Sequence, residues 1–199
     1  LQQSYRCSRL IQNCSQRIIG RVQNRIDKTW HGTDKEGLVQ YHSYPDSVDI
    51  GDDNWLIMAR TNYLLDEIER DIRLQGLFYK RNNRLPISQK LLSATGAWKK
   101  LNEGQDIELS DVKDIYSYMS SEIGIMRGHK NLKTSNKEKY DLFDLVKNHG
   151  LLVSNRPWDV AFDKVGTRDK EFLRSIETRN RDFTKIDPKI HLSTIHGAK

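Results

Sequence analysis

Residues 55–59 form a continuous apolar run, Trp-Leu-Ile-Met-Ala, with polar residues on both sides. Such a run is typical of a strand that is covered on both faces in a parallel sheet. Thr61 can cap a helix over residues 61–75, Gly76 can end it, and residues 77–80 read as a second short strand. Strand, helix and strand in so short a segment predict a βαβ unit with a right-handed crossover, and therefore an α/β fold with a parallel sheet.

The pattern changes at residue 82, and helical periodicity then dominates up to residue 188. The expected helices cover residues 88–102, 110–123, 137–148 and 169–182, with Ser110 capping the second. Strand character returns only at residues 190–195, so an all-α insertion is expected to interrupt the sheet. Before the sheet, residues 7–26 are expected to form an amphipathic helix, and residues 37–44 have strand character.

Composition excludes a membrane-spanning protein, because no apolar run approaches the ~20 residues that a spanning helix needs. The 199 residues carry a net charge of +6 with a pI near 9.2, which mildly favours a nucleic-acid partner. Cys7 and Cys14 lie two helical turns apart, too far for a disulfide, which favours a reducing compartment. The chain has no signal-peptide pattern and does not begin with Met, so we expect it to be a piece of a longer protein.

Three short strings carry candidate chemistry. In the first, Gln-Ser-Tyr-Arg-Cys-Ser at residues 3–8, Tyr5 and Arg6 stand just before a helix. An aromatic ring beside a planar cation suits a nucleotide, because the ring can meet a base and the guanidinium a phosphate. The alternative is a packed tyrosine beside a surface arginine.

The second string, Ala-Arg-Thr-Asn at residues 59–62, follows the best strand and begins a helix. Ligands of parallel sheets gather at the carboxyl ends of strands, and a helix start favours an anion. Arg60 and Asn62 are therefore candidates for phosphate binding, and the alternative is a capping Thr61 with solvated neighbours. The third string, residues 193–199, follows the last strand and ends in small and cationic residues that suit a loop touching phosphates.

Together, in this order and spacing, the strings resemble the UvrD/PcrA/Rep family of superfamily 1 DNA helicases. LQQSYRCS is similar to motif IV, L-x-x-N-Y-R-S; LIMARTN is similar to the strand and R-T-N loop that follow; LSTIHGAK is similar to motif V, T-x-H-x-x-K-G. The sequence departs from the motif at Ser4, where the family usually has Asn, and at Cys7, where it usually has Ser.

The resemblance implies a partial RecA-like parallel sheet, domain 2A, built from residues 1–81 and 189–199. Residues 82–188 would then be a helical insertion like subdomain 2B of the family. The motifs cover residues 1–81 and 189–199 well, whereas the insertion matches by position and helical character.

The resemblance also implies roles for single residues. Tyr5 would stack near the adenine of ATP, and Arg6 would reach the γ-phosphate as an arginine finger. Contacts to the single-stranded DNA backbone are implied for Arg60, Asn62, Thr194 and His196. Lys199 would lie at the junction of the nucleotide cleft and the DNA path.

The implied function is that of an ATP-dependent DNA helicase or translocase in a bacterial or phage-infected cytoplasm. ATP and Mg²⁺ would be bound mainly by an N-terminal RecA-like domain of the same polypeptide, because no Walker A string, G-x-x-x-x-G-K-[ST], occurs here. The chain alone is expected to be inactive and, since its sheet would be incomplete, to self-associate. The alternative is a non-enzymatic nucleic-acid-binding or interaction module on the same half fold.

Two further groups of residues suggest chemistry less strongly. The six histidines show no paired metal-ligand spacing, so no metal site is expected. Trp98, Trp158 and Tyr116 are expected in the core of the helical insertion, and the alternative is that they stack bases.

Overall fold

The computed structural model describes residues 3–51, 53–129, 132, 138–180 and 187–198. The chain divides into two compact units, residues 1–49 and residues 50–199, and each is described by itself. Both units mix helices with small parallel sheets, so the expected α/β class is confirmed. The predicted domain boundaries, after residues 81 and 188, differ from this division and stay predictions.

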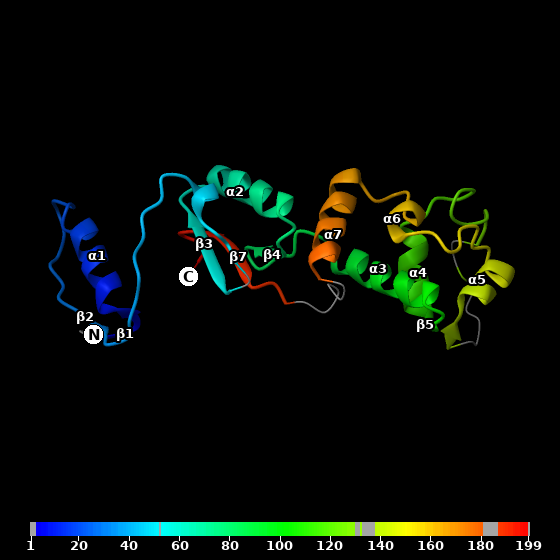
Figure 1. The fold of residues 1–199 in the computed structure, drawn as a ribbon, viewed down its shortest axis with the longest axis horizontal. Helices are drawn as coiled ribbons and strands as arrows, with labels where there is room; N and C mark the ends of the chain where they lie inside the picture. Colours follow the sequence, from blue (N-terminus) through cyan, green and yellow to red (C-terminus); the bar gives the residue numbers. More distant parts are fainter. Residues whose placement is uncertain (1–2, 52, 130–131, 133–137, 181–186, 199) are drawn as a thin grey trace. The chain divides into compact units, whose positions relative to one another are not determined.

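The first unit holds a two-stranded parallel sheet and one amphipathic helix (Figure 1). Its elements are β1 (Gln3–Ser8), α1 (Arg9–Ile19), β2 (His31–Thr33) and the short 3-10 helix η1 (Pro45–Ser47). Ser8 is buried and caps α1, since its hydroxyl accepts a hydrogen bond from the Ile11 amide at 3.4 Å. Gly37 is required beside it, because a Cβ there would lie 2.2 Å from the Ser8 Oγ.

Two expectations for this unit are wrong. The helix predicted over residues 7–26 begins at Arg9, because residues 3–8 pair as a strand, and ends at Ile19, before Gly20. The strand predicted over residues 37–44 is absent, and the backbone there is irregular. No apolar side chain is buried among the described residues of this unit, so no hydrophobic core covers the apolar side of α1 there.

The second unit is built on a parallel three-stranded sheet in the order β3-β7-β4 (Figure 1). Its strands are β3 (Trp55–Ala59), β4 (Tyr79–Arg81) and β7 (Ile190–Thr194), and α2 (Asn62–Leu74) connects β3 to β4. The predicted strand–helix–strand unit is confirmed, as are the Thr61 cap and the ending of α2 at Gly76, whose φ is +66°. The predicted return of the chain to the sheet after residue 189 is confirmed too, since β7 lies between the other two strands.

One face of the sheet is covered, and the other is exposed along β3. Helix α2 packs Leu65 and Ile72 onto the sheet, and both side chains are fully buried. On β3, however, Leu56 and Met58 are 57% and 50% exposed. The expectation of a strand covered on both faces is therefore wrong, and the expected self-association through this incomplete sheet stays a prediction.

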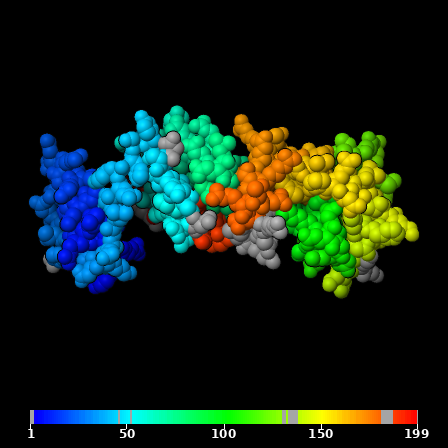
Figure 2. Space-filling view, viewed as in Figure 1, coloured from blue at the N-terminus to red at the C-terminus, as the bar shows by residue number. Residues whose placement is uncertain are grey.

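Between β4 and β7 the chain forms the expected helical segment, seen as one green-to-orange mass in Figure 2. Its helices are α3 (Gln89–Asn102), α4 (Leu109–Ser117), α5 (Leu142–Asn148), α6 (Trp158–Ala161) and α7 (Thr167–Arg179). The segment is not all-α, since β5 (Ile107–Glu108) and β6 (Lys139–Tyr140) pair antiparallel. Helix α4 is capped by Glu108 and not by Ser110, and it ends at Ser117, earlier than predicted.

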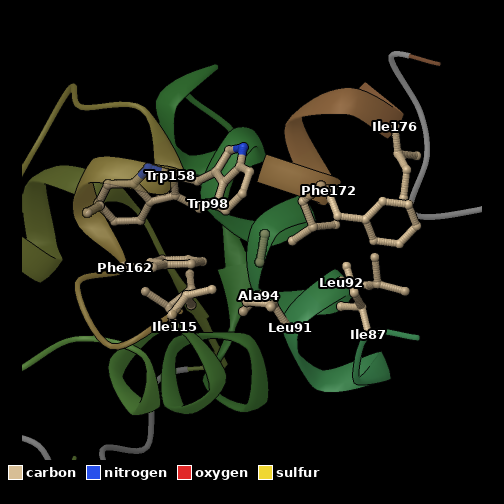
Figure 3. Close-up of a cluster of buried hydrophobic side chains, with 14 of the residues drawn as sticks. Ile87, Leu91, Leu92, Ala94, Trp98, Ile115, Trp158, Phe162, Phe172 and Ile176 are labelled. Atoms are coloured by element: carbon tan, nitrogen blue, oxygen red, sulfur yellow. The ribbon is translucent and has the colours of Figure 1, made fainter. Parts of the chain in front are cut away.

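Aromatic side chains form the centre of the helical segment (Figure 3). The Phe162 ring centroid lies 5.9 Å from that of Trp98 and 6.4 Å from that of Trp158. Trp98, Trp158 and Tyr116 are all at most 4% exposed. The expectation that they belong to the core is confirmed, and the alternative of base stacking is excluded by their burial.

Within the second unit, the helical segment also packs against the three-stranded sheet and helix α2. The Tyr79 ring of β4 lies 5.9 Å from the Phe172 ring of α7, and the Arg73 guanidinium of α2 lies over the same phenylalanine at 4.6 Å. Arg73 also donates to Asp169 of α7 at 3.1 Å. The sheet and the helical segment therefore share one hydrophobic core.

Gly76 tests this packing, because a Cβ there would lie 2.8 Å from the Ser175 Cβ of α7. We expect Gly76→Ala to lower the free energy of unfolding by about 1–2 kcal/mol for the left-handed backbone, and by a further 1–3 kcal/mol for the clash. Gly104 is the control, since its φ is also positive, +78°, and no atom lies within 4 Å of the added Cβ. Equal losses for the two variants, measured by urea unfolding, would contradict the packing of α7 on the end of α2.

Candidate nucleic-acid interface

The candidate site lies at the carboxyl edge of the three-stranded sheet. Strands β3 and β7 run parallel and in register, with Ala59 opposite Thr194. The pairing continues one step further, because the Ile195 amide donates to the Ala59 carbonyl at 3.0 Å. The two strands therefore end side by side, and Arg60 and His196 leave the sheet on neighbouring loops.

The loop after β3 presents one cation and one amide. Arg60 is exposed and has no carboxylate partner in the part of the chain that the structure describes. Thr61 caps α2, since its hydroxyl accepts from the Leu64 amide at 3.5 Å. Asn62 is the first residue of α2, where free backbone amides add positive potential.

Arg81, the last residue of β4, fixes the orientation of Asn62. Its Nη2 donates to the Asn62 carbonyl at 3.3 Å and to Asn62 Oδ1 at 3.4 Å, while its Nη1 is hydrogen-bonded to Asp66 and Glu69. Burial alone would lower the pKa of Arg81, but the two carboxylates outweigh it and raise the pKa. Since Oδ1 of Asn62 already accepts, its Nδ2 is the group left to donate to a ligand.

The loop after β7 is a tight turn closed on Thr194. The Gly197 amide donates to the Thr194 carbonyl at 2.9 Å and to its Oγ1 at 3.1 Å, and the Ala198 amide donates to the same carbonyl at 3.0 Å. The Thr194 hydroxyl keeps its proton for another acceptor, because it is the acceptor in this bond. His196 is exposed at the tip of the turn.

Tyr5 and Arg6 lie on β1 in the first unit, and both are exposed, Tyr5 to 79%. The Ser4 hydroxyl accepts from the Cys7 amide at 3.2 Å and from the Arg6 amide at 3.4 Å, so it holds the backbone around Arg6. This is a local bond that serine and asparagine side chains both make. Arg6 has no ion-pair partner among the described residues.

The structure thus brings together four of the predicted residues at one edge of the sheet, namely Arg60, Asn62, Thr194 and His196. Tyr5 and Arg6 lie in the other unit. Lys199 lies outside the described residues. The sequence interpretation missed the turn after β4, residues 81–84, although Asn-Asn between two arginines is a signal for a two-residue turn.

Comparison with known proteins identified no relative: no family model, no curated protein and no solved structure matches the chain. None of the helices in the described ranges is long and apolar enough to cross a membrane. Within the same ranges, no group of three or more His, Cys, Asp or Glu side chains is arranged to hold a metal ion.

The role of Arg81 can be tested against its neighbour Lys80. Arg81→Ala leaves Glu69, whose side chain is only 20% exposed, without its charged partner, so we expect a loss of about 1–3 kcal/mol in unfolding free energy. Lys80→Ala removes a 2.6 Å pair to Asp187, which is 86% exposed, and should cost under about 1 kcal/mol. Chemical denaturation of both variants measures the difference, and a larger loss for Lys80→Ala would contradict the assignment.

Proposed function

We propose that the chain is part of an ATP-dependent DNA helicase or translocase, to which it contributes half of a single-stranded DNA track and an arginine finger. The observation that carries the proposal is the parallel, in-register pairing of β3 with β7, which sets the Arg60 and His196 loops side by side. Residues 1–81 and 189–199 would be part of a RecA-like domain 2A, and residues 82–188 a 2B-like insertion. The position of β7, which joins the sheet only after the helical segment, supports this division.

Three of the predicted residues at this edge offer hydrogen-bond donors to a ligand. Arg60 supplies a full charge, Asn62 its Nδ2 protons, and Thr194 its hydroxyl proton. Phosphate oxygens are acceptors only, and they are the same in every nucleotide. Contacts of this kind position a strand without reading its bases, so binding would be independent of sequence and sensitive to salt.

For the nucleotide, the chain offers only one side of a composite site. Tyr5 and Arg6 are both exposed on β1, and Arg6 is free of a carboxylate partner in the described residues, which suits donation to a ligand held elsewhere. ATP and Mg²⁺ would be held mainly by an N-terminal RecA-like domain and would supply the phosphoryl group and its metal. Arg6 would then stabilise negative charge on that group as it is transferred, and Tyr5 would stack on the adenine.

The DNA track is tested with the 199-residue chain and labelled oligo-dT, with a mixed-sequence strand for comparison, at two salt concentrations. We expect weak binding of both strands, in or beyond the upper part of the ~10⁻⁶–10⁻⁴ M range, measured by fluorescence anisotropy. Arg60→Ala should weaken binding about two- to fivefold and flatten the salt slope by about 0.7. His196→Ala should have a smaller effect, because it removes a hydrogen-bonding group and no permanent charge.

Arg127→Ala is the matched control, since Arg127 is an exposed arginine on the loop after α4, far along the chain from the sheet edge. It changes the net charge equally and should leave the salt slope unchanged. Tight binding to one sequence that Arg60→Ala does not alter would contradict the track and would favour a site on the helical segment.

The finger is tested in the complete enzyme. Arg6→Ala should lower kcat by about 10³–10⁵-fold with nucleotide affinity largely kept, because a finger acts on charge that develops in the transition state. Tyr5→Ala should instead weaken nucleotide binding by about 1–3 kcal/mol, as loss of base stacking does. Steady-state ATP hydrolysis and nucleotide titration measure the two effects, and equal losses confined to kcat would contradict both roles.

A further inference from the structure

A third loop ends at the same edge of the sheet, beside an open hollow of about 550 Å³. The hollow lies at the carboxyl end of β4, and its lining residues are Glu69, Arg81, Asn82, Arg84, Leu85 and Pro86. Because β4 is parallel to β7, this loop leaves the sheet in the same direction as the loops after β3 and β7. The hollow is therefore next to the proposed track.

The loop is a rigid two-residue turn. The Arg81 amide donates to the Arg84 carbonyl at 2.8 Å, and the Arg84 amide donates back to the Arg81 carbonyl at 2.9 Å. Asn82 and Asn83 between them have φ values of +48° and +62°, as in the tight turns that favour asparagine. Pro86 follows two residues later and restricts the backbone further.

The turn is also tied to β7. The Asn82 amide donates to the Leu192 carbonyl at 3.0 Å, and Asn82 Oδ1 lies 3.4 Å from the Ser193 hydroxyl, whose proton it shares with the Thr194 carbonyl at 3.2 Å. Like Asn62, Asn82 therefore keeps its Nδ2 protons for another acceptor. The position of Arg84 is thus set by the strand that ends at Thr194 and leads into the His196 turn.

The charges of the hollow leave Arg84 as its available cation. Arg81 is paired with two carboxylates, Asp66 and Glu69, so its charge is not free for a ligand and the three groups together carry one negative charge. Arg84 is exposed, and among the described residues no carboxylate lies within ion-pair distance of it. An exposed guanidinium can meet two oxygens of one phosphate at once, and on a turn held by hydrogen bonds little backbone entropy is lost when it does so.

We propose that this hollow binds a backbone phosphate of the same single strand, with Arg84 as the direct contact and Asn82 as a second donor. The inference rests on the proposed function. It extends the proposed DNA track from the loops after two β-strands, β3 and β7, to the loop after a third, β4. Neighbouring strands lie about 4.8 Å apart, so Arg60 and Arg84 leave the sheet from strands about 10 Å apart, with β7 between them. The single-stranded DNA would therefore cross the edge of the sheet from the loop after β3 to the loop after β4.

The experiment compares Arg84→Ala, Arg84→Lys and Arg127→Ala in the 199-residue chain, by anisotropy with labelled oligo-dT at several salt concentrations. We expect Arg84→Ala to weaken binding about two- to fivefold and to flatten the salt slope by about 0.7, as loss of one phosphate contact does. Arg84→Lys should keep the slope, because the charge stays, but lose part of the affinity, because the bidentate geometry is gone. Arg127→Ala should keep the slope.

A failure of the Arg84 contact can be told apart from a failure of the whole DNA track. If Arg84→Ala behaves like Arg127→Ala while Arg60→Ala still weakens binding, the Arg84 contact is wrong and the track stands. If neither Arg60→Ala nor Arg84→Ala changes the binding or its slope, both are wrong.

A second measurement on the unaltered chain separates a strand phosphate from free phosphate. Backbone amide NMR signals of Asn82, Asn83 and Arg84 should shift on addition of oligo-dT and stay in place with inorganic phosphate at the same ionic strength. Shifts caused by inorganic phosphate and not by the oligonucleotide would overturn the proposal, as would signals that respond to neither.

Discussion

The insertion of β7 between β3 and β4 is the interaction on which the second unit depends. Both outer strands pair only with β7 among the described residues, and they do so in parallel and in register. β7 follows β4 only after a long helical segment, so its pairing closes a long loop, at an entropic cost that grows slowly with loop length. Burial of Ile190 and Leu192, each at most 4% exposed, offsets that cost.

The helical segment contributes to this closure by sharing the core of the sheet. Phe172 on α7 contacts both the Tyr79 ring and the Arg73 guanidinium, and Gly76 lets the end of α2 approach Ser175 closely. The packing of α7 on α2 therefore also fixes the point from which the chain returns to β7. In physical terms the insertion and the sheet form one packed unit, although the chain enters and leaves the insertion at separate points.

The sequence predicted those features that local patterns encode, and missed those that distant contacts decide. The apolar run of β3, the Thr61 cap and Gly76 all act within a few residues, and each lies where it was expected. The run could not reveal that Leu56 and Met58 are exposed, because the cover of a sheet face depends on other segments. Similarly, Glu108 rather than Ser110 caps α4, since its side chain and that of Asp111 bond the helix start reciprocally. At the candidate site, Arg60 and Asn62 follow from the strand–helix pattern, whereas the Asn82–Asn83 turn depends on bonds to β7.

The chemistry of the sheet edge follows from how its acceptors are used. Arg81 is hydrogen-bonded to two carboxylates near this edge, Asp66 and Glu69. The side-chain oxygen of Asn62 accepts from Arg81, and that of Asn82 accepts from Ser193. What remains for a ligand is an excess of donors: two exposed guanidinium groups, two amide Nδ2 groups and the Thr194 hydroxyl. A surface of this kind discriminates poorly between bases, which present donors as well as acceptors, and favours a polymer whose repeated oxygens only accept. The ion pairs of Arg81 thus have a second consequence beyond stability, because its one positive charge offsets one of the two carboxylate charges and so lessens their repulsion of a phosphate.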